Sequence, residues 1–121
     1  MRNLVFALLL LPAVAFAQYE NNPVQQRLWN GMTNTAPAYE MLLACERDVT
    51  ANLLLESVQE FIALSVSTEN DVRIAVEMWN RARINARLEY SDTIRGLTQT
   101  PQGKICNDLE NDVIHNLNEG I

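Results

Sequence analysis

Residues 38–95 have the sequence AYEMLLACERDVTANLLLESVQEFIALSVSTENDVRIAVEMWNRARINARLEYSDTIR, which contains neither glycine nor proline. Glycine and proline are the residues that most often end helices and form turns, so their absence here favours long helices over a turn-rich β fold. No part of the stretch alternates apolar and polar residues in the manner of a half-buried strand. The sequence therefore predicts an all-α fold.

Apolar side chains recur at helical spacing in two segments, residues 35–64 and 69–95. Between them, Thr68 and Asp71 resemble a capping box with Asp in the place of Glu, and Gly96 stands where a left-handed cap would end the second helix. The expected core stripe of the first segment is Leu42, Cys45, Val49 and Leu53, followed by Leu54, Val58, Phe61, Ile62 and Ser65. The shift between these two sets indicates either a kink or a helix covered on more than one side. The expected stripe of the second segment is Val72, Ala75, Trp79, Ala82, Ala86, Tyr90, Ile94 and Leu97.

Shorter helices are expected on either side of this pair. Each begins with an N-cap residue followed by proline (Asn22-Pro23, Thr100-Pro101) and ends at a glycine (Gly31, Gly120). The apolar positions are Val24, Leu28 and Trp29 in the first of them, and Cys106, Leu109, Val113 and Leu117 in the last. We therefore expect a small antiparallel bundle of about four helices.

Residues 1–17 have the pattern of a secretory signal peptide. Arg2 supplies the positive charge, residues 4–11 form the apolar segment, and residues 15–17 (AFA) match a cleavage site. The apolar segment is shorter than the about 20 residues that span a bilayer, and no cysteine at the junction offers a lipid anchor. We expect a periplasmic protein with one helical domain, residues 18–121, and no membrane anchor after cleavage. A eukaryotic secretory origin stays open.

Cys45 and Cys106 are the only two cysteines, and an even pair in an exported chain predicts a disulfide. Both lie on apolar stripes, so the bridge would join the second and fourth expected helices. A loop of about 60 residues closed in this way would gain about 4 kcal/mol of stability. A redox or metal site is the alternative, but the spacing is far from Cys-x-x-Cys.

Acidic side chains outnumber basic ones after residue 17, fifteen to eight, which gives a formal charge of −7. Nucleic acids and anionic membranes are bound through strongly cationic surfaces, so this balance argues against both as partners. A basic protein is a more compatible partner.

The motifs of common enzymes and cofactor sites are missing from the sequence. There is no nucleophile elbow, no zinc-binding histidine pair, no calcium loop and no Cys-x-x-Cys-His for haem. His115, the single histidine, is expected on the solvent side of the last helix. We therefore predict that the protein is not an enzyme and binds neither a metal nor a cofactor. An acid and base pair at Glu56 and Glu60 is the enzymatic alternative.

A cluster on the segment 69–95 is the candidate partner-binding site: Trp79, Arg81, Arg83, Arg87 and Tyr90. Because Arg83 and Arg87 lie one helical turn apart beside the apolar stripe, an acidic group should face them. That group belongs either to this chain (Glu46, Asp48, Glu56, Glu60, Glu77 or Glu89) or to a partner, since Arg, Trp and Tyr often anchor interfaces.

These features predict a small, acidic, exported interaction protein, monomeric or homodimeric. Its acidity would assist the capture of a basic toxin or envelope hydrolase, as an immunity or inhibitor protein does. The alternative is a carrier of a small apolar ligand, held in a pocket lined by Phe61, Ile62, Trp79 and Tyr90.

Overall fold

A computed structural model of the chain describes residues 22–119, so the predicted signal peptide lies outside the described residues. The helices are α2 (Pro23–Ala44), α3 (Asp48–Ser65), α4 (Glu69–Glu89), α5 (Ser91–Gln99) and α6 (Lys104–Glu119). No strand occurs within residues 22–119. The all-α prediction is confirmed, with five helices rather than about four.

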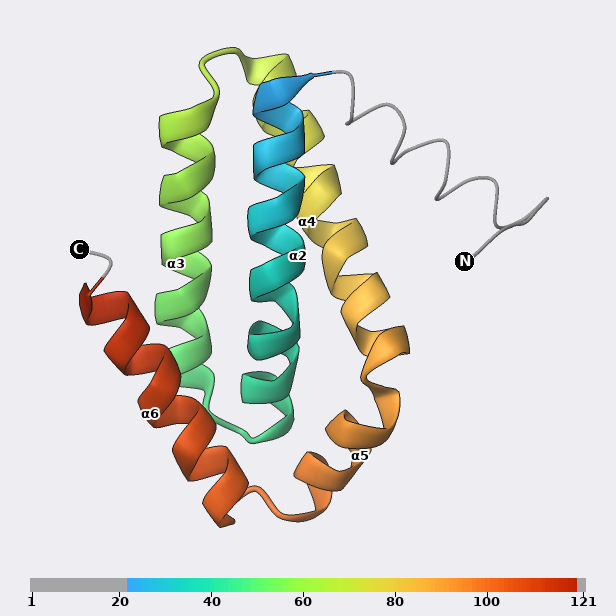
Figure 1. The fold of residues 1–121 in the computed structure, drawn as a ribbon, viewed down its shortest axis with the longest axis vertical. Coiled ribbons are helices and arrows are strands. Elements are labelled where there is room, and N and C mark those ends of the chain that lie inside the picture. The colour runs from blue at the N-terminus through green and yellow to red at the C-terminus, as the bar shows by residue number, and fades with distance from the viewer. Residues whose placement is uncertain (1–21, 120–121) are drawn as a thin grey trace, which may run out of the picture.

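Helix α2 is the centre of the bundle (Figure 1). It lies between α3 and α4, and it contacts each of the other four helices. The short α5 follows α4 at the lower end of the bundle, and α6 returns obliquely along α3. This arrangement places α3 and α6 side by side at one edge of the molecule.

The central helix runs through Gly31 and Pro37, so the expected helix end at Gly31 is wrong. Gly31 serves a close approach instead, because a Cβ there would lie 2.8 Å from the Cε2 atom of Phe61 on α3. Proline inside a helix removes one backbone donor. Buried residues on both sides of Pro37, such as Ala36 and Tyr39, hold α2 in the core and compensate for that loss.

The chain reverses between α2 and α3 at Glu46, the single non-glycine residue of positive φ (60°) among those described. The Arg47 N–H donates to the Leu42 carbonyl and the Glu46 N–H to the Leu43 carbonyl, both within 3.0 Å. These two bonds are the Schellman pattern that ends helices, with glutamate where glycine is usual. The expected continuous helix over residues 35–64 is therefore wrong.

This reversal also corrects the core stripe predicted from sequence. Leu42 and Cys45 are buried on α2, whereas Val49 and Leu53 lie on α3 and are 76% and 46% exposed. The helical period does not continue across the left-handed turn, so the two pairs do not share a face. Val72, at the start of the second predicted stripe, is also exposed.

Other expected helix ends are partly confirmed. The Asn22 side chain caps α2 by accepting from the Val24 and Gln25 N–H groups, and the Thr68 hydroxyl accepts from the Asp71 N–H. Two boundaries are wrong, because Gly96 lies inside α5 and α6 begins at Lys104 rather than beside Pro101. The predicted 69–95 helix is divided in the structure, because a separate short helix begins at Ser91.

One main core lies where α2, α3 and α4 meet, and α6 adds Val113. A smaller cluster of Cys45, Leu97 and Cys106 lies at the lower end. None of the described helices has the length and apolar character needed to cross a membrane. The main core consists of Leu28, Trp29, Met32, Ala36, Tyr39, Leu42, Ala51, Leu54, Val58, Ile62, Ala75, Met78, Trp79, Ala82, Ala86 and Val113.

The predicted disulfide is confirmed between Cys45, which caps α2, and Cys106 on α6. Both cysteines are fully buried, and their Cα atoms lie 5.7 Å apart. The bridge links residues 61 positions apart and so joins the end of α2 to the first turn of α6.

Replacing Glu46 with glycine is expected to raise the free energy of unfolding by about 0.5–1 kcal/mol, because glycine adopts positive φ without a Cβ clash. Urea denaturation of the purified protein measures the change. Glu46→Ala is the matched control, since it removes the same charge but keeps the Cβ. Equal stabilisation by alanine and glycine would contradict the backbone explanation.

Reduction of the disulfide is expected to lower the free energy of unfolding by about 4 kcal/mol, the chain-entropy value for a loop of this length. Denaturation with and without dithiothreitol gives the difference. In the Cys45→Ala/Cys106→Ala variant, the reductant should have no effect. A wild-type midpoint that does not respond to reductant would exclude the bridge as a stabilising element.

Candidate functional site

The outer face of α3 carries an exposed stripe of apolar and acidic side chains, which we call the α3 stripe. Its members are Val49, Leu53, Glu56, Glu60 and Leu64. At 100° per residue they lie within an arc of about 80° on one side of the helix. Exposed large apolar residues are common singly, but a row of them marks an interaction surface. Val49 and Leu64 are 76% and 83% exposed.

A groove of about 330 Å³ lies between this stripe and the second half of α6. Leu53, with Ile114 and Leu117 from α6, contributes its apolar lining, while Glu56 and Glu60 contribute carboxylates. The oblique packing of α6 against α3 brings the two walls together (Figure 1). The full lining is Leu53, Glu56, Ser57, Glu60, Ile114, Asn116, Leu117 and Asn118.

The electrostatic character of this groove is negative. Helix α3 contains no lysine or arginine, and α6 has none after Lys104. The ion pairs described in residues 22–119 include neither Glu56 nor Glu60. Two like charges one helical turn apart repel each other. A cationic group at the groove would relieve this repulsion.

The arginine pair of the predicted partner-binding cluster is satisfied inside the chain. Arg83 Nε lies 2.5 Å from Glu40 Oε2, and Arg87 Nη1 lies 3.3 Å from Glu40 Oε1. Glu40 is buried on α2, and the Arg83 guanidinium also lies 4.9 Å from the centre of the Tyr39 ring. Arg83 and Arg87 are therefore paired within the chain. Their partner is Glu40, which is not among the acidic residues expected from the sequence.

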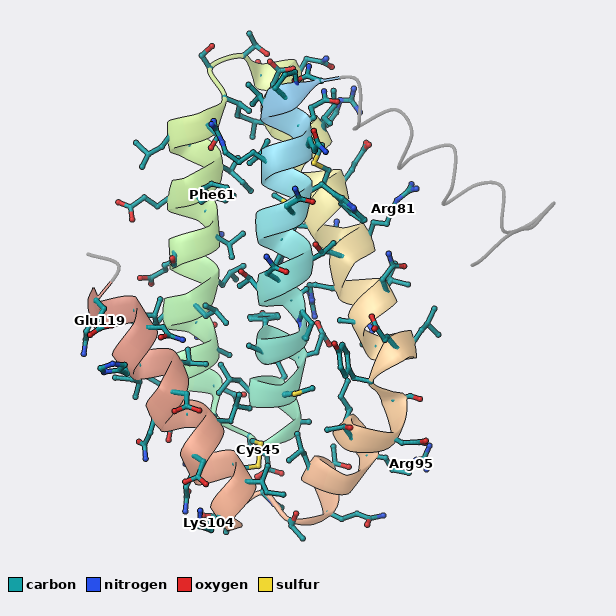
Figure 2. The ribbon with its side chains drawn as sticks, viewed as in Figure 1. Cys45, Phe61, Arg81, Arg95, Lys104 and Glu119 are labelled. Atoms are coloured by element: carbon teal, nitrogen blue, oxygen red, sulfur yellow. A yellow bond between two sulfur atoms is a disulfide. The ribbon has the colours of Figure 1, made fainter. Side chains whose placement is uncertain are left out.

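The ion pairs of Glu40 do not include the other members of that cluster. Trp79 lies in the core, 6% exposed, with its ring edge against Tyr39 at 5.5 Å between ring centres. Tyr90 is half-buried at the junction of α4 and α5. Arg81 is half-buried and points outward from α4 (Figure 2). A role of this cluster in partner binding stays a prediction.

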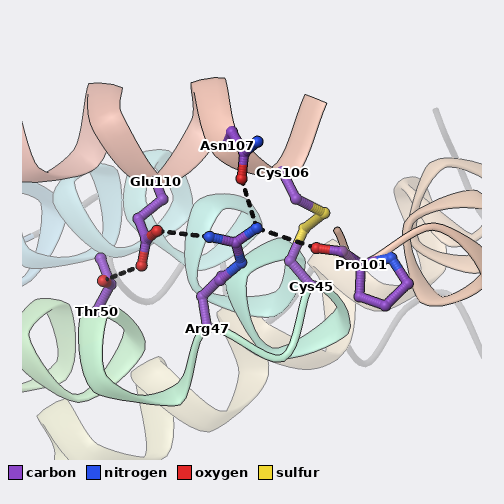
Figure 3. Close-up of polar contacts among 7 residues, drawn as sticks. All are labelled: Cys45, Arg47, Thr50, Pro101, Cys106, Asn107 and Glu110. Atoms are coloured by element: carbon purple, nitrogen blue, oxygen red, sulfur yellow. Dashed lines mark hydrogen bonds and ion pairs between the residues drawn. A yellow bond between two sulfur atoms is a disulfide. The ribbon is translucent and has the colours of Figure 1, made fainter. Parts of the chain in front are cut away.

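A further arginine, Arg47, holds α6 in place beside the disulfide (Figure 3). Its guanidinium contacts Glu110 Oε1 at 2.7 Å, Asn107 Oδ1 at 2.6 Å and the Pro101 carbonyl at 3.1 Å. The Thr50 hydroxyl donates to the other Glu110 oxygen at 2.6 Å. We call these five residues the Arg47 clasp. These contacts hold α6 in place, and α6 forms one wall of the groove.

The Arg47 clasp lowers the pKa of Glu110 below its ordinary value of 4.5. The Thr50 hydrogen bond is the largest cause; partial burial opposes it, and the Arg47 hydrogen bond and charge add to the lowering. A carboxyl with a lowered folded-state pKa stabilises the fold above its unfolded pKa. That contribution is lost as the pH falls through the folded pKa.

His115 is exposed on α6, 3.4 Å from Glu119, as its helical position predicts. No group of three or more potential metal-binding side chains occurs in residues 22–119. Of the residues expected to line a carrier pocket, Ile62 and Trp79 belong to the core, and Phe61 borders a 230 Å³ cleft beside Gly31.

Comparison of the chain with known protein families, with curated proteins and with solved structures found no match. Sequence reasoning missed the α3 stripe because it assigned Val49 and Leu53 to the core. The sequence does carry one signal for this surface, which is the lack of basic residues from position 48 to 65. The structure adds that a leucine near the end of this helix is exposed.

Replacing Thr50 with valine is expected to lower the free energy of unfolding at pH 7 by about 1 kcal/mol, because a hydrogen bond to a carboxylate is lost. The difference from wild type should shrink as the pH falls below 4.5, the ordinary pKa of a glutamate in the unfolded chain, and be lost as the pH falls through the lowered folded-state pKa of Glu110. Denaturation midpoints of the wild type and of Thr50→Val at pH 7 and pH 3 measure this difference.

The control for this prediction is the same substitution in a Glu110→Gln background. There, the effect of Thr50→Val should be the same at both pH values. A Thr50→Val effect in the wild-type background that is unchanged at pH 3 would show that Glu110 does not mediate it.

Proposed function

We propose that this protein is an exported, periplasmic binding protein that captures a basic protein, in the manner of an inhibitor or immunity protein acting on a toxin or envelope hydrolase. The α3 stripe carries this proposal. Its exposed apolar residues offer contact area, and Glu56 and Glu60 offer charges that no side chain of α3 neutralises. Surfaces of this kind are typical of protein interfaces.

The charge of the whole chain supports a basic partner. Six of the eight lysine and arginine side chains in residues 22–119 are already in ion pairs within the chain: Arg47, Arg73, Arg83, Arg87, Arg95 and Lys104. The surplus of acidic groups is left facing solvent. A net negative field raises the association rate with a cationic protein and disfavours acidic competitors.

The proposed compartment rests on two features of the sequence and the fold. Residues 1–17 have the pattern of a signal peptide, and the Cys45–Cys106 bridge belongs in an oxidising environment. The carrier alternative has less support, because the residues expected to line its pocket are divided between the core and a separate cleft.

Affinity capture from an envelope extract is expected to retain a protein of basic isoelectric point, identified by mass spectrometry. Purified together, the two should form a complex whose affinity falls as the salt concentration rises from 50 to about 300 mM, because screening weakens charge attraction. If the captured protein is an enzyme or toxin, an equimolar amount of this protein should inhibit it.

The matched control is the same capture with the protein reduced and unfolded in denaturant before coupling to the resin. Retention of the same protein by that resin would indicate charge attraction without a folded surface. The proposal fails if the folded protein retains no basic protein, or if the retained complex does not depend on salt. Fractionation by osmotic shock tests export separately, and a chain that stays in the cytoplasm would contradict it.

A further inference from the structure

We propose that the groove between α3 and α6 binds a cationic amphipathic helix that the partner presents. This inference rests on the proposed function and assigns that function to one surface and one kind of ligand. A helix of this type lays an apolar face into a groove and places basic residues at its edges. The groove offers the complementary arrangement of apolar lining and carboxylates.

The apolar contribution comes from both walls. Leu53 is 46% exposed and Ile114 is 37% exposed, and both line the groove together with the half-buried Leu117. A volume of about 330 Å³ suits a few apolar side chains of a docked helix. Beyond the groove, Val49 and Leu64 extend the contact surface along α3. At 1.5 Å per residue, they mark a length of about 22 Å, which is that of a helix of about 15 residues.

The acidic contribution has a helical spacing of its own. Glu56 and Glu60 lie one turn apart, which is the spacing of basic residues at positions i and i+4 of a docked helix. Neither carboxylate is in an ion pair described for residues 22–119, so no internal contact would have to be broken on binding. By contrast, Glu40 and Glu110 are held by arginines of the chain.

A second copy of this chain fits the groove less well than a cationic helix. In a two-fold dimer the same patch faces itself, so the acidic surface of Glu56 and Glu60 would face a second acidic surface. A wholly apolar small molecule would leave these carboxylates next to an apolar surface without a counter-charge. The chemistry of the groove therefore favours a ligand that is both apolar and cationic.

The test uses a synthetic leucine and lysine peptide of about 15 residues with an amphipathic helical pattern, the length set by the α3 stripe. Isothermal titration calorimetry measures its binding to the folded, oxidised protein. We expect binding to the wild type, and a roughly tenfold weaker affinity for Glu56→Gln/Glu60→Gln, because two charge pairs are lost. A peptide with glutamate in place of lysine should not bind.

Glu69→Gln/Glu89→Gln on α4 is the matched control, since it removes the same charge from two exposed sites away from the groove. We expect its affinity to stay within about twofold of the wild type, the effect of net charge alone. Leu53→Asn tests the apolar part and should also weaken binding without loss of charge. Circular dichroism of each variant verifies that the fold is retained.

Equal weakening by the two glutamine pairs would overturn the proposal, because the peptide would then respond only to net charge. Absence of peptide binding, or dimerisation of the protein through the groove at micromolar concentration, would overturn it as well. The same variants separate this inference from the proposed function. A natural basic partner that binds wild type and Glu56→Gln/Glu60→Gln equally would refute the groove and leave the proposed function intact.

Discussion

The attachment of α6 to the end of α2 is the constraint on which the rest of the structure depends. Helix α6 fully buries only Cys106 and Val113, and its Leu109 and Leu117 pack against the core while partly exposed. The disulfide between Cys45 and Cys106 fixes the first turn of α6 covalently. Hydrogen bonds from Arg47 to Asn107 and Glu110 then hold the residues of α6 that follow. In a domain this small, the core alone supplies limited stability, and a disulfide commonly makes up the difference.

The same attachment creates the candidate surface. Once α6 is fixed at its beginning, its second half lies along α3, and Ile114 and Leu117 form the wall opposite Leu53. The left-handed turn at Glu46 sets the other wall, because it determines which side of α3 faces the core and leaves Val49 and Leu53 exposed. Two local features near residues 45–47 therefore determine a groove that lies more than one helical turn away from them.

The fold class was largely predictable, because it depends on composition and spacing. The absence of glycine and proline from residues 38–95 indicated helices, and the cysteine pair indicated the bridge. The helix boundaries were not predictable in the same way. Gly31 and Gly96 lie inside helices, and the true reversal occurs at a glutamate, Glu46. A glycine can serve close packing against Phe61 as well as a turn, and tertiary contacts can force an ordinary residue into the left-handed region.

The candidate site was harder to predict because exposure depends on how the helices pack, and the sequence shows only their periodicity. The sequence marked Arg83 and Arg87 as candidates for partner binding, yet both are paired with Glu40, a residue adjacent to the aromatic core. Such pairing has a consequence elsewhere in the molecule. The paired basic side chains lie on α4, on α5, at the start of α6 and at Arg47 in the turn before α3, whereas Glu56 and Glu60 on α3 are in no ion pair described for residues 22–119. A cationic group from outside the chain would relieve the repulsion between these carboxylates, so the distribution of the internal ion pairs favours α3 as the surface for the proposed basic partner.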